Sequence, residues 1–493
     1  MKNLTYLTFI IGLFHQLLAA PAPITVRELA LATLKNNFDL KLSKIAIDEK
    51  KTVIEQEIGD YDYRLSSSHS RAKNNTPSSS SLDGAGNASS VKSSSTSSSL
   101  TLAKKFNTGT EISIPYNVTI TKSNSTTRTI AKTYEPSLTL SITQPLLKGF
   151  DATYVARDIE EARMDVEIEQ LKNLEAINKK LQEALELYFD TILKHEQIGI
   201  RRTGSKNAKQ NMAFITEKHR LGKASQIEYL EAKTAFQKTE DSLLTAQIDY
   251  QNIRDQLALL VFGDSNHQID FINISQLLHN LPPLIANQEV TELIQQAITD
   301  RDKVKRYQLT LAKAGFKLAN AVRDRLPDLD LAADLTHKGL GSSLSSANRH
   351  LTDGRYRSWN TSLTISKPLM AYASTAYWQQ QKLKHQQEMI RMEQARRDVR
   401  LEVQKSLRKL ASGKIQIKAF SAALAAEEKK YAELKIRHQQ GRVSTYELNQ
   451  GLQAVQNTEV SLLKAKVGHI KNYYAKASAT GKLLSMIGVS INR

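Results

Sequence analysis

The chain has 493 residues, of which 40% are hydrophobic, 24% charged and 6% aromatic, and its formal net charge is +18. It contains no cysteine, which excludes disulfides, thiolate metal sites, a catalytic cysteine and a lipoprotein anchor. The basic residues are mixed with Glu and Asp and form no patch interleaved with aromatic residues. The charge excess is therefore interpreted as solvated surface, and no nucleic-acid partner is expected.

Residues 1–20 have the pattern of a secretory signal peptide. Lys2 precedes an apolar run from Leu4 to Leu18, which ends at Ala19 and Ala20, although Pro21 leaves the cut site uncertain. No later apolar run reaches the roughly 18 residues that a membrane helix needs. The sequence therefore predicts an exported chain that is periplasmic, secreted or an outer-membrane β-barrel.

The first half, residues 21–263, is predicted to be one structural repeat. A strand is expected near 61–70, followed by a serine-rich segment, 66–99, whose composition indicates a flexible, dispensable external loop. A second strand near 134–144 leads into a long helix over 151–221, a tip at 221–225 and a helix over 226–262. Proline is absent between Pro145 and Pro282, as long helices require.

The second half, residues 290–487, repeats this order after a linker, 264–289, in an equatorial region. Strands are expected near 327–337 and 357–367, then a long helix over 370–440, a tip at 440–444, a helix over 445–485 and a tail, 488–493. Apolar residues recur every seven residues at Val403, Leu410, Ile417 and Leu424, which predicts helices that wind around their neighbours.

The duplication is visible in three matching segments. The segment from Lys218 to Glu228 recurs as Arg437 to Glu447, with His, Gly, Ser and Glu in the same places. In each copy Gly suits a helix end and Ser suits an N-cap, so each copy is predicted to be a helical hairpin tip. The two other matches pair Val26–Leu29 with Val290–Leu293 and Ser137–Leu146 with Asn360–Leu369. These matches are 264 and 223 positions apart, so the first copy carries 41 extra residues, assigned to the serine-rich loop.

The expected strands alternate between apolar and small polar residues. Leu138, Leu140 and Ile142 share one face, with Ser and Thr between them, and residues 61–65 are expected to pair with this strand. Residues 329–335 are expected to pair with the strand near 357–367. One apolar and one polar face suit a barrel with lipid outside and water inside. Four strands cannot close a transmembrane barrel alone, which predicts an oligomer.

The ordered set of motifs resembles the TolC family of outer-membrane efflux proteins over about residues 24–487. The motifs are Val26–Leu34 with Asn36–Asn37, Gln144–Phe150, Leu326–Leu329 and the tips at Gly222 and Gly441. The resemblance implies a mainly α fold with a membrane β-barrel part. In a homotrimer, each chain gives four strands to a twelve-stranded barrel and its coiled-coil helices to a trimeric α-barrel tunnel. It also implies a periplasmic adaptor (membrane fusion) protein and an inner-membrane transporter as partners, contact with outer-membrane lipid, and neither enzymatic activity nor a cofactor.

The resemblance also implies two groups of functional residues. The adaptor-contact tips are Leu221, Gly222, Lys223, Gln440, Gly441 and Arg442. The periplasmic entrance is formed by Glu228, Glu447 and Gln450. Family members can carry acids at both of the last two positions, so one acid is missing here, and Val443 stands where some members have a basic latch. The tip histidines His219 and His438 are expected to be exposed.

The function expected from this pattern is a passive duct of a tripartite efflux pump or a type I secretion system. It would export small molecules or polypeptides. The alternative is a structural or adhesive coiled-coil protein of the envelope, which the long heptads would suit but the duplicated strands would not. A periplasmic adaptor is a third possibility, disfavoured because adaptors have one hairpin. No catalytic, metal or phosphate-binding motif is found in the sequence.

Overall fold

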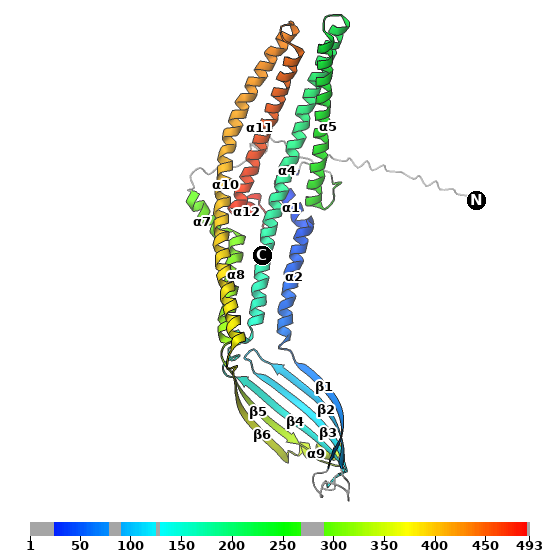
Figure 1. Ribbon diagram of the computed structural model, residues 1–493, viewed down its shortest axis with the longest axis vertical. Coiled ribbons are helices and arrows are strands. Elements are labelled where there is room, and N and C mark those ends of the chain that lie inside the picture. The colour runs from blue at the N-terminus through cyan, green and yellow to red at the C-terminus, as the bar shows by residue number, and fades with distance from the viewer. Residues whose placement is uncertain (1–23, 78–89, 125–128, 268–289, 491–493) are drawn as a thin grey trace, which may run out of the picture. The chain divides into compact units, whose positions relative to one another are not determined.

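The computed structural model describes residues 24–77, 90–124, 129–267 and 290–490 (Figure 1). The expected signal peptide and most of the linker lie outside these residues. The chain divides into two compact units, one made of residues 1–44, 172–305 and 395–493, the other of 45–171 and 306–394. Each boundary falls within a helix, and each unit combines segments of both sequence repeats.

Helices account for most of the described chain. Their bounds are α1 (Val26–Asn36), α2 (Phe38–Gly59), α3 (Ala152–Val155), α4 (Arg157–Arg220), α5 (Gln226–Phe262), α7 (Val290–Asp300), α8 (Asp302–Arg323), α9 (Leu344–Thr352), α10 (Tyr372–Gln439), α11 (Thr445–Ala479) and α12 (Leu483–Ile487). The helix expected over 445–485 is interrupted after Ala479. Gly481 has φ +74° there, and the Lys482 amide donates to the Ala477 carbonyl at 2.8 Å. A glycine in the left-handed region is the usual way to end a helix.

The core of the first unit lies where α1, α4, α5, α11 and α12 meet. Its largest fully buried side chains include Tyr188 and Phe189 of α4, Leu257 of α5, Ile470 of α11 and Leu483 of α12. The Tyr188 hydroxyl donates to the Ile24 carbonyl at 2.8 Å, so burial leaves this polar group satisfied. Each such side chain contributes about 1.5–3 kcal/mol when removed from water.

The second unit contains a six-stranded antiparallel sheet with the order β1-β2-β3-β4-β5-β6 (Figure 1). The strands are β1 (Arg64–Pro77), β2 (Ser90–Lys105), β3 (Glu111–Ser123), β4 (Lys132–Pro145), β5 (Asp328–Lys338) and β6 (Tyr356–Ser366). Every strand therefore pairs with its neighbour in the sequence. Four strands come from the first repeat and two from the second.

The sheet has one apolar and one polar face. Register places Leu140 opposite Leu335, which in turn lies opposite Trp359. On each strand, the residues adjacent to these apolar ones lie on the other face. On that face Ser70, Ser97 and Thr119 of three neighbouring strands lie in one row. Paired residues share a face because side chains alternate along a strand. The expected alternation is thus present across the sheet.

Two expectations about the strands are wrong. The serine-rich segment 66–99 was expected to be a loop, but its described residues belong to β1 and β2; residues 78–89 lie outside the description. The described residues accordingly form six strands in place of the expected four. Residues 61–65 were expected to pair with the strand containing Leu138, but β1 pairs with β2, and β4 lies between β3 and β5.

The physical reason lies in cross-strand bonding of the hydroxyl groups. Ser68 and Ser99 are 2.8 Å apart between their Oγ atoms, and Ser97 Oγ lies 3.2 Å from Thr119 Oγ1. Small hydroxyl side chains on one face need no core, because they bond across the strands and remain hydrated. Serine content alone therefore does not distinguish a linker from the wet face of a sheet.

The loop between β5 and β6 contains α9, which packs on the apolar face. The Tyr116 hydroxyl of β3 donates to Asn348 Oδ1 of α9 at 3.1 Å, and Ala347 is fully buried. Tyr116 lies opposite Leu138 in the register, on the face with the apolar side chains. The helix therefore covers part of the apolar face where β3 and β4 extend beyond the end of β5.

Candidate functional site

The first predicted tip is a tight connection between α4 and α5. Gly222 follows the end of α4 with φ +68°, and its amide donates to the His219 carbonyl at 3.0 Å. The Lys223 amide donates to the Lys218 carbonyl at 2.8 Å. This pair of bonds satisfies the last helix carbonyls and requires the left-handed conformation that glycine adopts without strain.

The second tip repeats this geometry between α10 and α11. Gly441 has φ +73°, its amide donates to the His438 carbonyl at 3.0 Å, and the Arg442 amide donates to the Arg437 carbonyl at 2.9 Å. A Cβ atom at Gly222 or Gly441 would meet no atom within 4 Å. Backbone conformation, and not lack of space within the chain, is therefore the constraint at both positions.

Each tip continues into a helix that starts with a capping box. Ser225 Oγ accepts from the Glu228 amide at 3.2 Å, and Glu228 Oε2 accepts from the Ser225 amide at 2.7 Å. Ser444 and Glu447 make the same two bonds at 3.2 and 3.0 Å. These bonds, first of all those from the Ser amides, lower the pKa of both glutamates. The proposed entrance acids are therefore ionised, and each holds a helix start as well.

The tips expose both apolar and basic side chains. Leu221 and Ile227 are 53% and 69% exposed at the first tip, and Tyr446 is 56% exposed at the second. Lys223 and Arg442 are exposed beside the two glycines. Apolar side chains with positive charge around them suit contact with another protein.

The two tip histidines differ. His438 is 6% exposed, and its Nε2 lies 3.2 Å from Thr445 Oγ1. Burial lowers the pKa of His438, nearby Lys218 lowers it further, and Glu228 opposes this effect. His219 is partly buried, stacks on Tyr229 and bonds the Ala224 carbonyl at 2.9 Å. The expectation that both are exposed is therefore wrong.

The structure brings the two tips close to each other. The ring of Phe214 on α4 lies 6.2 Å from that of His438 on α10. Asn211 of α4 donates to Asn449 Oδ1 of α11 at 3.3 Å. Gln450, the third expected entrance residue, is exposed and its amide donates to the Tyr446 hydroxyl. All nine expected site residues thus belong to the first unit, on the two hairpin ends.

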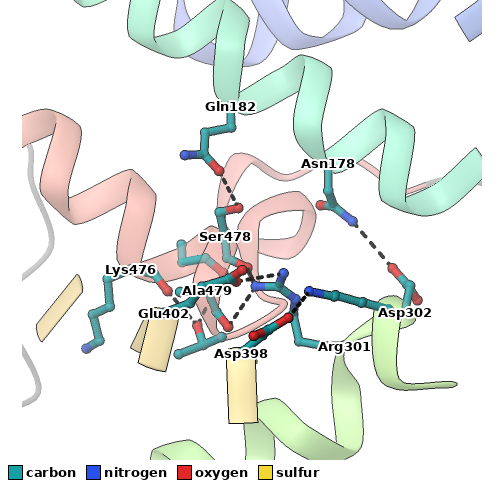
Figure 2. Close-up of polar contacts among 12 residues, drawn as sticks. Asn178, Gln182, Arg301, Asp302, Asp398, Glu402, Lys476, Ser478 and Ala479 are labelled. Atoms are coloured by element: carbon teal, nitrogen blue, oxygen red, sulfur yellow. Dashed lines mark hydrogen bonds and ion pairs between the residues drawn. The ribbon is translucent and has the colours of Figure 1, made fainter. Parts of the chain in front are cut away.

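A second polar cluster was not found by sequence reasoning. Figure 2 shows Arg301, between α7 and α8, aimed at the end of α11. Its Nη1 donates to the Ser478 and Ala479 carbonyls, both at 3.0 Å, and its Nη2 lies 3.0 Å from Glu402 Oε2 on α10. Ser478 Oγ also donates to Gln182 Oε1 of α4 at 2.8 Å (Figure 2). One arginine therefore ties the end of α11 to α10 and to the start of α8.

The described residues contain no group of three or more His, Asp or Glu side chains that could hold a metal ion. Among the same residues, no helix is long and apolar enough to cross a membrane.

Comparison with known proteins gives a match to a family model over part of the chain and a shared fold over most of it. Residues 293–472 match the family of outer membrane efflux proteins, which is a family of channels and not of enzymes. No curated protein sequence matches the chain.

Several solved outer-membrane channels share the fold of the whole chain. CusC has a TM-score of 0.69 at 18% identity, covering 92% of both chains. The Campylobacter jejuni CmeC channel has a TM-score of 0.67 at 14% identity, covering 98% of this chain and 94% of its own. The Neisseria gonorrhoeae MtrE channel has a TM-score of 0.65 at 13% identity, covering 93% and 89%. The mainly α fold with a sheet, and the resemblance to TolC-type proteins, are confirmed.

Proposed function

Because its second repeat matches the outer membrane efflux proteins and its fold is that of outer-membrane channels, we propose that this chain is one subunit of a passive export duct. The duct serves a tripartite efflux pump or a type I secretion system. It carries small molecules or polypeptides across the periplasm and the outer membrane. The helical part lies in the periplasm and the sheet lies in the outer membrane.

The observation that carries this proposal is the two-faced sheet. The apolar face, with Leu140, Leu335 and Trp359, suits the acyl chains of outer-membrane lipid. The opposite face is lined with Ser and Thr and suits a water-filled lumen. The alternative function, an adhesive coiled-coil protein, does not explain a sheet with one apolar and one hydrated face.

The proposed partners follow from the same arrangement. A single open sheet leaves its edges unpaired, which favours edge-to-edge pairing between copies of the chain. By the resemblance to TolC-type proteins, the assembly is a homotrimer. The exposed tips, including Leu221, Lys223, Gln440 and Arg442, meet a periplasmic adaptor coupled to an inner-membrane transporter. No nucleic acid, cofactor or metal takes part.

The tips provide the test. The double change Gly222→Val and Gly441→Val places β-branched residues at positive φ, which costs about 1–3 kcal/mol at each tip and reshapes the connection. Export of the cargo in cells should be lost, while the amount of heat-modifiable protein in the outer membrane stays unchanged. Binding of the purified variant to a tethered adaptor should fall in parallel.

The matched control is Gly199→Val with Gly468→Val. Both glycines lie inside helices of the same unit, have no positive φ, and have nothing within 4 Å of an added Cβ. This control should retain export. Full export by the tip variant would remove the tips from the mechanism.

A further inference from the structure

The sheet has two edge strands, β1 and β6, which run in opposite directions. Within the part of the chain that the structure describes, β1 and β6 each pair with one strand only, and every residue of both is exposed. β1 follows α2, and β6 leads toward α10, so the two edge strands run in opposite directions across an antiparallel sheet. The edges are therefore suited to pair with each other, antiparallel, between copies of this chain.

The two faces also match across this seam. On β6, Trp359 and Leu363 share the apolar face, with Asn360 and Ser362 on the other. On β1, Leu65 lies on the apolar face and Ser66, Ser68 and Ser70 lie on the polar face. Pairing β1 with β6 of a neighbour therefore continues the polar face and places Leu65 on the same side as the apolar residues of β6. Pairing of β1 with β1, or of β6 with β6, would be parallel and would match the faces less well.

We propose that the neighbour on both edges is a second copy of this chain and that three copies close one barrel of eighteen strands, six from each chain. This rests on the trimer of the proposed function. The resemblance implied twelve strands, but the 41 extra residues of the first repeat hold two further strands within the sheet. Barrel diameter grows about linearly with strand number, so the barrel is about 1.5 times as wide as one of twelve strands.

The strand lengths agree with membrane insertion. A tilted transmembrane strand needs about 9–11 residues, and β5 and β6 have 11 each. β1 and β2 have 14 and 16. On β1 the outward side chains beyond Leu65 turn polar at His69, Arg71 and Lys73. The outward face of β1 is therefore polar over most of its length, and Leu65 is its apolar contribution.

Disulfide trapping tests the seam, and the chain has no native cysteine to interfere. Cysteines at Ser68 and Ser362 lie on the polar faces of β1 and β6. Within one chain these strands are separated by five steps of about 4.8 Å, well beyond the roughly 7 Å that a disulfide spans. Oxidation of membranes should therefore give linked dimers and trimers on non-reducing gels. Variants with Ser66→Cys or Ser70→Cys in place of Ser68→Cys locate the register.

Two controls distinguish the possible failures. Ser68→Cys with Ser99→Cys joins neighbours in the known register and should give an internal disulfide only. Asn117→Cys with Ser362→Cys tests a barrel built from β3 to β6, in which the first hairpin is left out. Two results would overturn the eighteen-stranded barrel. In the first, only the Asn117 and Ser362 cysteines link neighbouring copies. In the second, the protein is a trimer that forms the internal disulfide between positions 68 and 99, but no pair links neighbouring copies. Light scattering that gives a monomer would instead overturn the proposed function.

Discussion

At the residue scale, Glu447 has two roles. Its carboxylate completes the capping box of α11 and carries a charge at the proposed entrance. A negative charge beside an ion path attracts cations and repels anions, so both effects change the permeability ratio in the same direction. Glu447→Gln should therefore reduce cation over anion permeability several-fold in planar-bilayer recordings. Glu447→Lys should shift the preference toward anions.

A second variant, Ser444→Ala, separates the capping role of Glu447 from the effect of its charge. Gln also completes a capping box, so Glu447→Gln should keep the helix start, whereas Ser444→Ala removes the cap at a cost of about 1 kcal/mol and keeps the charge. A permeability change in Ser444→Ala equal to that in Glu447→Gln would assign the effect to the backbone of the tip. Unchanged reversal potentials in both glutamate variants would place Glu447 outside the ion path.

His438 makes the second tip sensitive to acid. Its pKa is lowered in the folded tip by burial and by Lys218, against the opposing effect of Glu228. Below the ordinary value of 6.5, the unfolded segment therefore binds a proton before the folded one does. The stabilisation is complete above pH 6.5 and declines as the pH falls toward the lowered pKa.

Hydrogen exchange measures this effect. The opening free energy of amides at 436–448, corrected for intrinsic exchange rates, should fall between pH 7 and about pH 5.5. His438→Gln retains a partner for Thr445 and does not titrate, so its opening free energy should vary less with pH. His219→Gln, at the equivalent place in the first tip, should leave the dependence of the second tip unchanged. Equal pH profiles in the native protein and His438→Gln would contradict the assignment.

At the element scale, Arg301 fixes the end of α11. Its side chain is 19% exposed and donates to the Ser478 and Ala479 carbonyls in the last turn of the helix. The Ser478 carbonyl also accepts from the Gly481 amide at 3.1 Å. Arg301→Met should lower the free energy of unfolding by at least about 1.5–3 kcal/mol, the contribution of one hydrogen bond to a charged group. Thermal unfolding of the detergent-solubilised protein measures the loss.

The pair of Lys51 with Asp48 is the matched control. Both side chains are more than half exposed, at 55% and 62%, and an exposed ion pair contributes between about 0 and 1 kcal/mol. Lys51→Met should therefore leave the melting temperature nearly unchanged. A loss in Arg301→Met no larger than in Lys51→Met would show that α11 ends without help from α10 and α8.

Local sequence patterns predicted the helix ends but not the contacts between segments that are distant in the sequence. The glycines at 222 and 441 and the serines that follow them indicated both tips, because helix ends are determined by residues within one turn. The Arg301 cluster could not be predicted, because Arg301, Glu402 and Ser478 are remote in the sequence. The start of β1 was expected, but β2 and β3 were missed. β2 was missed because serine content was weighed by composition, although Leu100 and Leu102 alternate with Ser and Thr.

At the scale of the whole molecule, the open sheet requires neighbours. We expect the detergent-extracted protein to be a trimer, since a membrane sheet with two free edges leaves backbone groups without partners in lipid. Chemical crosslinking should give species of up to three chains, and light scattering should give the mass of three chains after subtraction of detergent. A stable monomer in the soluble periplasmic fraction would contradict both the trimer and the membrane location.

The four-and-two division of strands between the repeats has a consequence for how such a protein diversifies. A hairpin is the smallest insertion that keeps both edge strands in their original directions, so it can be gained without disturbing the joint between copies. Because each of the three copies carries the inserted hairpin, the insertion adds six strands to the barrel. The two helical hairpins keep matching tips despite this addition. The width of the β-barrel and the fit of the helical tips to the adaptor therefore change independently of each other.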